Sequence, residues 1–226
     1  MNTHNALTFS VFLLLSLFLQ AASAELKLPA KPRPTTTSSA AQLGSHDNNL
    51  GLKAGETVPE FKTNTYEGKS IRFSSLLKNA PLLVIFYRGG WCPYCNYQVR
   101  QVTQAYDKFR QRHVTPVLIS VDKPEGAALV KQSYAIPFPV LSDPELRAHE
   151  AFNTIIKVDK ADYERYKSHG MDLEAWSGQT HHKMTAPAVF LVTSDGRVVW
   201  SHVALDFKTR PSVEQLLGVI DTTLKL

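Results

Sequence analysis

The chain has 226 residues, of which 25 are Lys or Arg and 20 are Asp or Glu, so its formal net charge is +5. Because this excess is small and the basic residues form no runs, the composition argues against a nucleic-acid partner. The chain has only two cysteines, which excludes a scaffold held together by several disulfides. The length that follows the first 24 residues suffices for one domain with a full core.

The first residues have the pattern of a secretory signal. An apolar run of about 14 residues extends from Ala6 to Leu19, whereas a membrane-spanning helix needs about 20. The sequence Ala22-Ser23-Ala24 follows and matches a small-residue cleavage site. We therefore predict a signal peptide over 1–24, a periplasmic or secreted protein, and no stable membrane insertion after cleavage. An uncleaved membrane anchor is the alternative.

The next segment, residues 25–50, is poor in large apolar side chains. Pro29, Pro32 and Pro34 lie in it, together with a cluster of Thr and Ser at 35–39. Such a segment buries too little apolar surface to offset its chain entropy. We predict a disordered linker over 25–50 and a folded domain over 51–226.

Within the folded domain, strand and helix patterns alternate. The continuous apolar run Leu82–Tyr87 predicts a strand that is buried on both faces. Apolar residues after Cys95 recur at helical spacing and predict a helix that ends near Arg112. Further strands are expected at 70–73, 117–121 and 139–141, and further helices at 124–134 and 143–152.

The carboxyl-terminal third contains a polar stretch, a hairpin and a last helix. The stretch 159–183 lacks a regular apolar pattern, and we expect an irregular insertion that overhangs the site. Two apolar runs at 188–192 and 198–200 flank an Asp-Gly turn and predict a β-hairpin. Ser212 and Gln215 match a capping box for the last helix. The alternation predicts an α/β sandwich with a central mixed β-sheet flanked by helices.

The two cysteines, Cys92 and Cys95, are spaced C-x-x-C between the strand at 82–87 and the helix that follows. A strand that ends in C-x-x-C and turns into a helix is a redox arrangement. The positive end of the helix dipole favours a thiolate at Cys92, and Cys95 lies one turn further along, within reach of a disulfide. The pair carries two electrons, so we expect no cofactor. A purely structural disulfide over so short a loop would constrain the unfolded chain only weakly.

The cysteine motif and several distal motifs resemble the peroxiredoxin-like proteins of the AhpC/TSA type that carry C-x-x-C. The resemblance implies a thioredoxin-like three-layer sandwich and an antioxidant thiol oxidoreductase, and it extends over most of the predicted domain. The segments that carry it are Phe86–Asn96, Ser177-Gly178, Ala186–Phe190, Asp195-Gly196 and Asp206–Pro211.

Two reaction schemes follow from this resemblance. If the substrate is a protein disulfide, Cys92 attacks it and Cys95 resolves the mixed disulfide. If the substrate is a hydroperoxide, alignment on Phe86-Tyr87 makes Cys95 the attacking cysteine, and Cys92 occupies the place of the usual Thr or Ser. In either scheme a dithiol donor, which is a thioredoxin-like protein or a membrane reductase, restores the dithiol.

The resemblance also implies which residues contact the substrate. In the thioredoxin fold the proline that matches Pro187 is cis and lies against the C-x-x-C. Pro187 also stands where peroxiredoxins place an Arg that polarises the peroxide, and Arg88 and Lys183 are the candidates to supply this charge instead, the alternative being that both are solvated cations. The apolar rim of the site is expected to consist of Trp91, Pro93, Tyr94, Ala186 and Pro187.

Metal binding is the alternative from a different class of function. Cys92, Cys95, His181 and His182 offer thiolate and imidazole ligands, as in thioredoxin-like copper-delivery proteins. Such a protein would bind and deliver the metal without redox turnover. Adjacent residues of an extended chain point to opposite sides, so His181 and His182 seldom bind one ion. We therefore expect no metal site.

Overall fold

The structure is a computed structural model that describes residues 25–78 and 80–226. The predicted signal peptide, residues 1–24, lies outside the described residues. Within the described ranges, no helix is long and apolar enough to cross a membrane.

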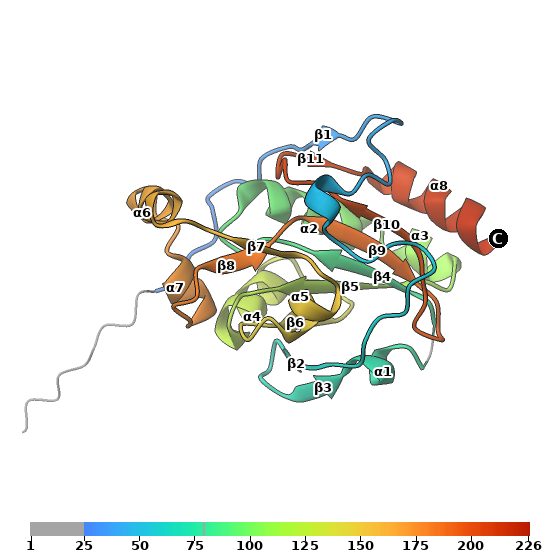
Figure 1. The fold of residues 1–226 in the computed structure, drawn as a ribbon, viewed down its shortest axis with the longest axis horizontal. Coiled ribbons are helices and arrows are strands. Elements are labelled where there is room, and N and C mark those ends of the chain that lie inside the picture. The colour runs from blue at the N-terminus through green and yellow to red at the C-terminus, as the bar shows by residue number, and fades with distance from the viewer. Residues whose placement is uncertain (1–24, 79) are drawn as a thin grey trace, which may run out of the picture.

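A seven-stranded sheet forms the centre of the molecule, with the strand order β10-β9-β4-β5-β6-β2-β3 (Figure 1). The strands β4, β5 and β6 run parallel, and the other neighbours pair antiparallel. The sheet is therefore mixed, as the sequence predicts. Its strands are β2 (Lys62–Thr65), β3 (Ser70–Arg72), β4 (Leu82–Phe86), β5 (Thr115–Ser120), β6 (Val140–Ser142), β9 (Ala188–Val192) and β10 (Val198–Val203).

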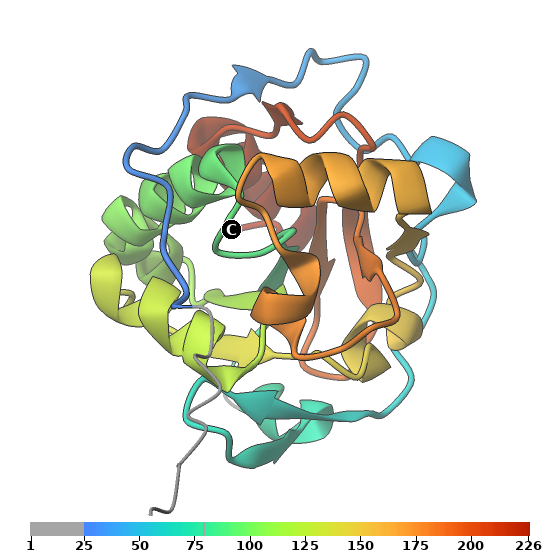
Figure 2. The same ribbon diagram turned by 90° about the vertical axis from the view of Figure 1, so that its left-hand side faces the viewer.

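Helices cover both faces of the sheet and produce three layers (Figures 1 and 2). The central strand β4 is buried on both faces, because alternate side chains enter two apolar cores. Leu83 and Ile85 belong to the core beneath α2, α3, α4 and α8, whereas Val84 and Phe86 belong to the core beneath α1 and α5. These helices are α1 (Phe73–Leu76), α2 (Pro93–Gln104), α3 (Tyr106–Gln111), α4 (Pro124–Ser133), α5 (Arg147–Ala151) and α8 (Val213–Leu224).

Two predictions near the carboxyl terminus are confirmed. The strands β9 and β10 form the expected antiparallel hairpin, with a register shift between Val198 and Trp200. The Ser212 hydroxyl accepts the N–H of Gln215 at 3.2 Å, and the Gln215 side chain accepts the N–H of Ser212 at 2.9 Å. This reciprocal pair is the capping box that begins α8.

The long helix predicted after Cys95 is interrupted. It is divided at Ala105, whose φ of −94° and ψ of 8° leave the helical region, into α2 and α3. Two residues earlier the Thr103 hydroxyl donates to the Val99 carbonyl at 2.8 Å. Such a bond to the preceding turn bends helices, so the interruption has a local cause that apolar spacing does not reveal.

The polar stretch 159–183, expected to be irregular, contains helices. Asp159 caps α6 and accepts the N–H of Asp162 at 2.8 Å, and Asp172 caps α7 in the same way. The helix expected over 143–152 is also shorter, because Leu146 has a left-handed φ of 63° directly before α5. The additional elements are α6 (Lys160–Ser168), α7 (Leu173–Ser177) and the paired strands β7 (Ile155–Lys157) and β8 (Lys183–Thr185).

The structure differs from the predicted disordered linker over 25–50, because this segment follows the surface of the domain. The short strand β1 (Thr36–Thr37) pairs in parallel with β11 (Thr209–Arg210). The N–H of Ser38 donates to the Arg210 carbonyl at 2.9 Å, and Ser38 is only 2% exposed. A single turn of 3-10 helix, η1 (Asp47–Asn49), follows. Pairing between backbones at a strand edge needs no apolar side chains. The amino-acid composition of residues 25–50 therefore does not predict this pairing.

The part of this segment before Ser38 is held by few contacts. Leu26 and Leu28 are only partly buried against the main core, and both residues of β1 are exposed. A hydrogen bond contributes about 1 kcal/mol, whereas ordering one residue costs about 1–2 kcal/mol of backbone entropy. The hydrogen bonds of residues 25–37 therefore do not by themselves offset the cost of ordering this segment.

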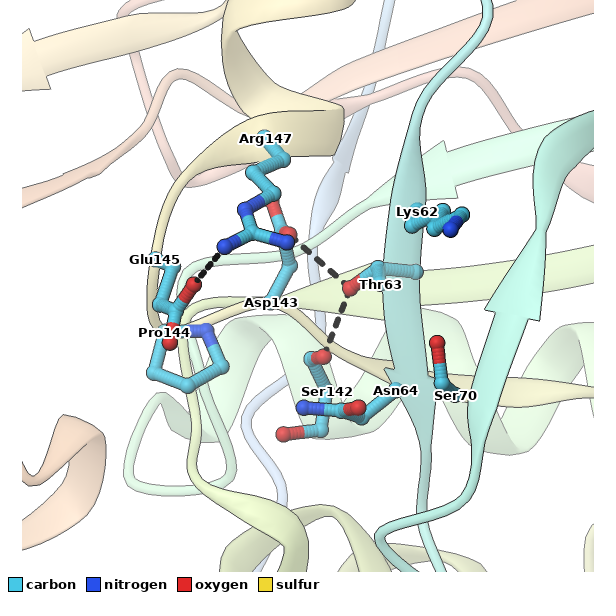
Figure 3. A pocket seen from close by; sticks show the side chains of 9 residues that line it. All are labelled: Lys62, Thr63, Asn64, Ser70, Ser142, Asp143, Pro144, Glu145 and Arg147. Carbon is cyan, nitrogen blue, oxygen red and sulfur yellow. Dashed lines mark hydrogen bonds and ion pairs between the residues drawn. The ribbon is translucent and has the colours of Figure 1, made fainter.

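A buried polar cluster joins β2 to the end of β6, next to a small hollow of about 40 Å³ (Figure 3). The hydroxyl of Thr63 lies 2.7 Å from the Ser142 carbonyl and 2.9 Å from a carboxylate oxygen of Asp143. The other oxygen of Asp143 lies 2.5 Å from Nδ1 of the fully buried His149. Neither cysteine lines this hollow, and the cluster ties α5 to the sheet.

Candidate active site

Both cysteines lie where β4 leads into α2. Cys92 is the N-cap residue of α2 and Cys95 lies in its first turn, and a disulfide joins them with their Cα atoms 5.3 Å apart. The sulfur of Cys92 accepts the N–H of Cys95 at 3.2 Å. The free amides of the first helical turn therefore favour a thiolate at Cys92 once the disulfide is reduced.

The loop between β4 and α2 is fixed from two sides. One carboxylate oxygen of Asp122 accepts the N–H of Gly90 at 2.8 Å and the hydroxyl of Ser120 at 2.9 Å. From α2, the side chain of Asn96 donates to the Gly90 carbonyl at 2.7 Å. Gly89 has a φ of 149°, and a Cβ there would lie 2.6 Å from the other oxygen of Asp122. Both the backbone conformation and the space therefore require glycine at this position.

The carboxyl group of Asp122 lies in an unusual environment for an acid. The residue is fully buried, and burial raises its pKa to about 7 although the hydrogen bonds from Gly90 and Ser120 act in the opposite direction. Its second oxygen has no hydrogen-bond partner among the described residues. A group that titrates near neutral pH thus lies directly beneath the loop that leads to the cysteines.

A buried guanidinium contacts the second cysteine. Nη2 of Arg210 lies 3.6 Å from the sulfur of Cys95, and Nη1 donates to the Thr209 carbonyl at 3.0 Å. Arg210 is 3% exposed; its burial, and then the charge of Arg88, lower its pKa to about 9. It therefore remains protonated at neutral pH. Its Nε is buried and donates to no acceptor in the described part of the chain.

A second cation, Arg88, lies among aromatic rings on the Cys92 side. Its guanidinium carbon is 4.4 Å from the ring centroid of Phe207 and 4.8 Å from that of Trp91. Its Nη2 donates to the hydroxyl of Tyr166 at 3.0 Å, and burial lowers its pKa. Of the two cations considered from the sequence, Arg88 lines the site, whereas Lys183 begins β8 and does not line it.

A groove of about 570 Å³ opens beside Cys92, which is itself 1% exposed. Cys95 does not line this groove. Among the described residues, no carboxylate lines it either, and its charge is positive. The aromatic walls come from Trp91, Tyr94, Tyr166 and Phe207, and the cations are Lys27, Arg33, Arg88 and Lys208.

The structure brings together three of the five residues predicted for the apolar rim. Trp91, Pro93 and Tyr94 line the groove. Ala186 is fully buried in the core on the opposite face of the sheet, and neither it nor Pro187 lines the groove. The expected cis bond before Pro187 is wrong, because the described residues contain no cis peptide. Pro187 lies in the short connection between β8 and β9, and the peptide bond before it is trans, as most bonds before proline are.

The two histidines considered as metal ligands have other partners. Nε2 of His181 lies 2.9 Å from the Pro144 carbonyl, and Nε2 of His182 lies 2.6 Å from a carboxylate oxygen of Glu174. Across residues 25–78 and 80–226, no group of three or more His, Cys, Asp or Glu side chains is arranged to hold a metal ion. The geometry does not favour the copper-delivery alternative.

The sheet, its helical layers and the cysteine pair at the start of α2 define a thiol-based redox protein built on the thioredoxin fold. A model of the AhpC/TSA family matches residues 54–201, and the chain belongs to this family.

Among relatives, peroxiredoxin Bcp of Escherichia coli strain K12 is 26% identical over 161 residues, which cover 70% of this chain and 88% of that protein. The chloroplastic peroxiredoxin Q of Populus jackii is 30% identical over 92 residues. That match covers 41% of this chain and 43% of the poplar protein, so it spans less than half of either.

Solved structures show the same fold at low sequence identity. Peroxidoxin BcpB from Mycobacterium tuberculosis superposes with a TM-score of 0.59 at 18% identity, and covers 76% of this chain and 97% of its own. A cysteine mutant of peroxiredoxin 6 from Arenicola marina superposes with a TM-score of 0.61 at 20% identity, and covers 78% and 74%. These likenesses confirm the thioredoxin-like three-layer sandwich.

Sequence reasoning did not identify Arg210 or Asp122 as site residues. Arg210 lies in the distal motif Asp206–Pro211, which resembles the family, but no spacing links it to Cys95. Asp122 follows the buried strand β5, which is parallel to β4. The carboxyl ends of adjacent parallel strands meet at one edge of a sheet. The position of Asp122 directly after a predicted buried strand therefore indicates that it lies near the end of β4, where the cysteine loop begins.

We expect Asp122→Asn to remove a pH dependence of stability. The unfolded chain loses the proton of Asp122 near pH 4, whereas the folded protein loses it near pH 7. Between pH 4 and pH 7 the folded protein therefore binds one more proton at Asp122 than the unfolded chain does. As pH rises through this range, Asp122 lowers the free energy of unfolding of the wild type, by at most about 4 kcal/mol. In denaturant titrations from about pH 4 to pH 8, the variant should gain stability over the wild type with rising pH. A difference that is constant over this range would contradict the assignment.

Proposed function

We propose that the protein reduces hydroperoxides, with Cys95 as the attacking thiolate and Cys92 as the resolving thiol. The observation that carries this proposal is the contact of 3.6 Å between Arg210 Nη2 and the Cys95 sulfur. A buried cation at this distance favours the thiolate over the thiol. The Nε–H of Arg210 is buried and has no acceptor among the described residues, and it would donate to the negative charge that develops on a peroxide oxygen bound beside it. Arg210 thereby replaces the Arg that peroxiredoxins place at the position of Pro187.

The proposed cycle has three balanced steps. The Cys95 thiolate attacks one peroxide oxygen, the O–O bond breaks, and Cys95 becomes a sulfenic acid, while the departing alkoxide or hydroxide takes a proton from solvent and leaves as the alcohol or water. The Cys92 thiol then attacks the Cys95 sulfur, which forms the disulfide and releases water. A dithiol protein finally reduces this disulfide through a mixed disulfide and is itself oxidised. Peroxide-reducing relatives of the Bcp and peroxiredoxin Q kind support this chemistry.

The two cysteines face different parts of the site, which fits this division of roles. Cys92 lines the groove, so an incoming thiolate reaches Cys92 first. Its attack expels Cys95 as a thiolate beside Arg210. Because a thiol of lower pKa leaves faster, the same cation assists both attack on peroxide and reduction of the disulfide.

Reduction of protein disulfides is a second candidate function. It is favoured by the position of Cys92, which caps α2 and lines the groove in front of an aromatic wall. In this scheme Cys92 attacks the substrate disulfide and Cys95 releases the reduced product. The two functions assign the first attack to different cysteines and are separable by substitution.

We expect Cys95→Ser to abolish peroxide reduction and Cys92→Ser to retain a single turnover. The reduced Cys92→Ser protein should accumulate a sulfenic acid on Cys95, because the resolving thiol is missing. Stopped-flow mixing with hydrogen peroxide, followed by dimedone labelling and mass spectrometry, measures this. The double serine variant is the control. Trapping of substrate proteins by Cys95→Ser, with no peroxide consumption by the wild type, would instead establish the disulfide-reductase scheme.

We expect Arg210→Met, made in the Cys92→Ser background, to slow the reaction with hydrogen peroxide about 10- to 100-fold. It should also raise the pKa of the Cys95 thiol, because a neighbouring cation is removed. Arg210→Lys keeps the positive charge, so the pKa of the Cys95 thiol should stay low. The reaction with hydrogen peroxide should still be slower than with Arg210, because the guanidinium donors are lost. The exposed Arg197→Met is the matched control. Peroxide rates and thiolate absorbance against pH measure both effects, and an unchanged thiol pKa would refute this role.

We also propose that the protein is exported and acts as an antioxidant in the periplasm or outside the cell. The apolar run at 6–19 and the small residues before Glu25 support removal of residues 1–24. The mature protein purified from the periplasmic fraction should begin at Glu25 by intact mass. Full-length chain confined to the cytosol would contradict export.

A further inference from the structure

We propose that residues 26–37, here called the N-terminal strap, form a displaceable cover over the face at which a thioredoxin-type dithiol protein docks to reduce the Cys92–Cys95 disulfide. The backbone of that partner would take the place of β1 along the edge of β11. This inference rests on the proposed function, because it concerns the step that restores the dithiol.

The strap lies on the route to the disulfide. Leu28 and Arg33 line the same groove as Cys92. The N–H of Arg33 donates at 3.0 Å to the carbonyl of Pro93, the residue directly after Cys92. Figure 2 shows the blue strap running past the green helix α2. A thiolate that approaches Cys92 through the groove therefore passes the strap.

The size of the attacking molecule decides whether the strap obstructs it. Cys92 is 1% exposed and Cys95 is fully buried, and the sulfur that borders the groove of about 570 Å³ is that of Cys92. A small dithiol fits in a space of this volume. A folded protein presents its cysteine on a broad surface, which the strap keeps away from Cys92. Reduction by a protein therefore requires the strap to lift.

The strap has the contacts of a segment that can lift. Its prolines lack N–H donors, and Leu26 and Leu28 are only partly buried. Its strand β1 is bound to β11 through Thr36, whose N–H donates to the Lys208 carbonyl at 2.9 Å. Firm attachment begins at Ser38, which is 2% exposed and whose carbonyl accepts the side chain of Gln215 at 2.7 Å. Ser38 is thus the hinge.

Charge and strand pairing favour a partner in the place of the strap. The strap contributes Lys27 and Arg33 to a groove that already contains Arg88 and Lys208, with no carboxylate in its described lining. Lys27 is paired with Glu25 at 3.2 Å, so it is Arg33 that adds an unpaired like charge beside Arg88 and Lys208, and a neutral or acidic partner avoids this repulsion. When β1 lifts, the edge of β11 is exposed, and an exposed strand edge is a template for an extended backbone. Such pairing would hold Arg210 beside Cys95.

The test frees the strap at two independent points. Thr36→Pro removes the donor to Lys208, and Leu28→Ser weakens the packing at the other end of the strap without adding a charge. Thr37→Pro is the matched control, because alternate residues of a strand face opposite sides and the Thr37 N–H points away from β11. The rate of disulfide reduction is measured by stopped flow with reduced thioredoxin and, separately, with dithiothreitol.

If the strap is open about a tenth of the time, both release variants should be reduced by thioredoxin about tenfold faster than the wild type. Thr37→Pro should behave as the wild type, and the dithiothreitol rate should change less than about twofold in every protein. Unchanged thioredoxin rates in both release variants overturn the proposal. An equal gain with dithiothreitol also overturns it, because the strap would then shield the sulfur from every reductant.

Peroxide consumption by the pre-reduced wild type is measured alongside these rates. If peroxide is not consumed while the release variants are still reduced faster, the proposed peroxidase function fails and the cover over the docking face stands. If peroxide is consumed and thioredoxin reduces the release variants no faster than the wild type, the proposed peroxidase function stands and the cover over the docking face fails.

Discussion

The burial of two guanidinium groups beside the cysteine pair is the constraint on which the site depends. Arg88 donates to a tyrosine hydroxyl and Arg210 donates to backbone carbonyls, so these contacts leave both charges without a neutralising partner. The charge of Arg88 also lowers the pKa of Arg210, after the larger effect of burial. A thiolate at Cys95 supplies the missing negative charge at 3.6 Å from Arg210. In the proposed cycle this contact would stabilise the reduced state, and a couple of this kind is readily reduced by a dithiol donor.

The features that the sequence predicts correctly are local in the chain. The unbroken apolar run of β4, the C-x-x-C at the start of α2 and the reciprocal cap at Ser212 each depend on residues within one or two turns. The mixed sheet follows from the order of such elements. Contacts that complete the site join distant residues instead: Asp122 is 32 residues from Gly90, and Arg210 is 115 residues from Cys95. No periodicity encodes those separations, so only the fold reveals them.

The predictions that differ from the structure share a cause, because each relied on an apolar pattern or on the wider superfamily. Residues 25–37 are poor in large apolar side chains, yet backbone pairing of β1 with β11 places them against the domain. The helix α6 is almost entirely polar on its exposed side and is set by its Asp159 cap. Pro187 was assigned a place at the cysteines by likeness to thioredoxins. In this chain that neighbourhood is occupied by β11 and Arg210, and the proline simply joins two strands.

The position of the strap has a practical consequence for handling the protein. A purification tag or fusion partner attached at residue 25 would emerge next to the redox centre and would compete with whatever binds there. The carboxyl-terminal Leu226 is 63% exposed, and Figure 1 places that end of the chain on the side opposite to where the amino-terminal segment enters. Immobilisation through the carboxyl terminus leaves the reactive surface facing the solution.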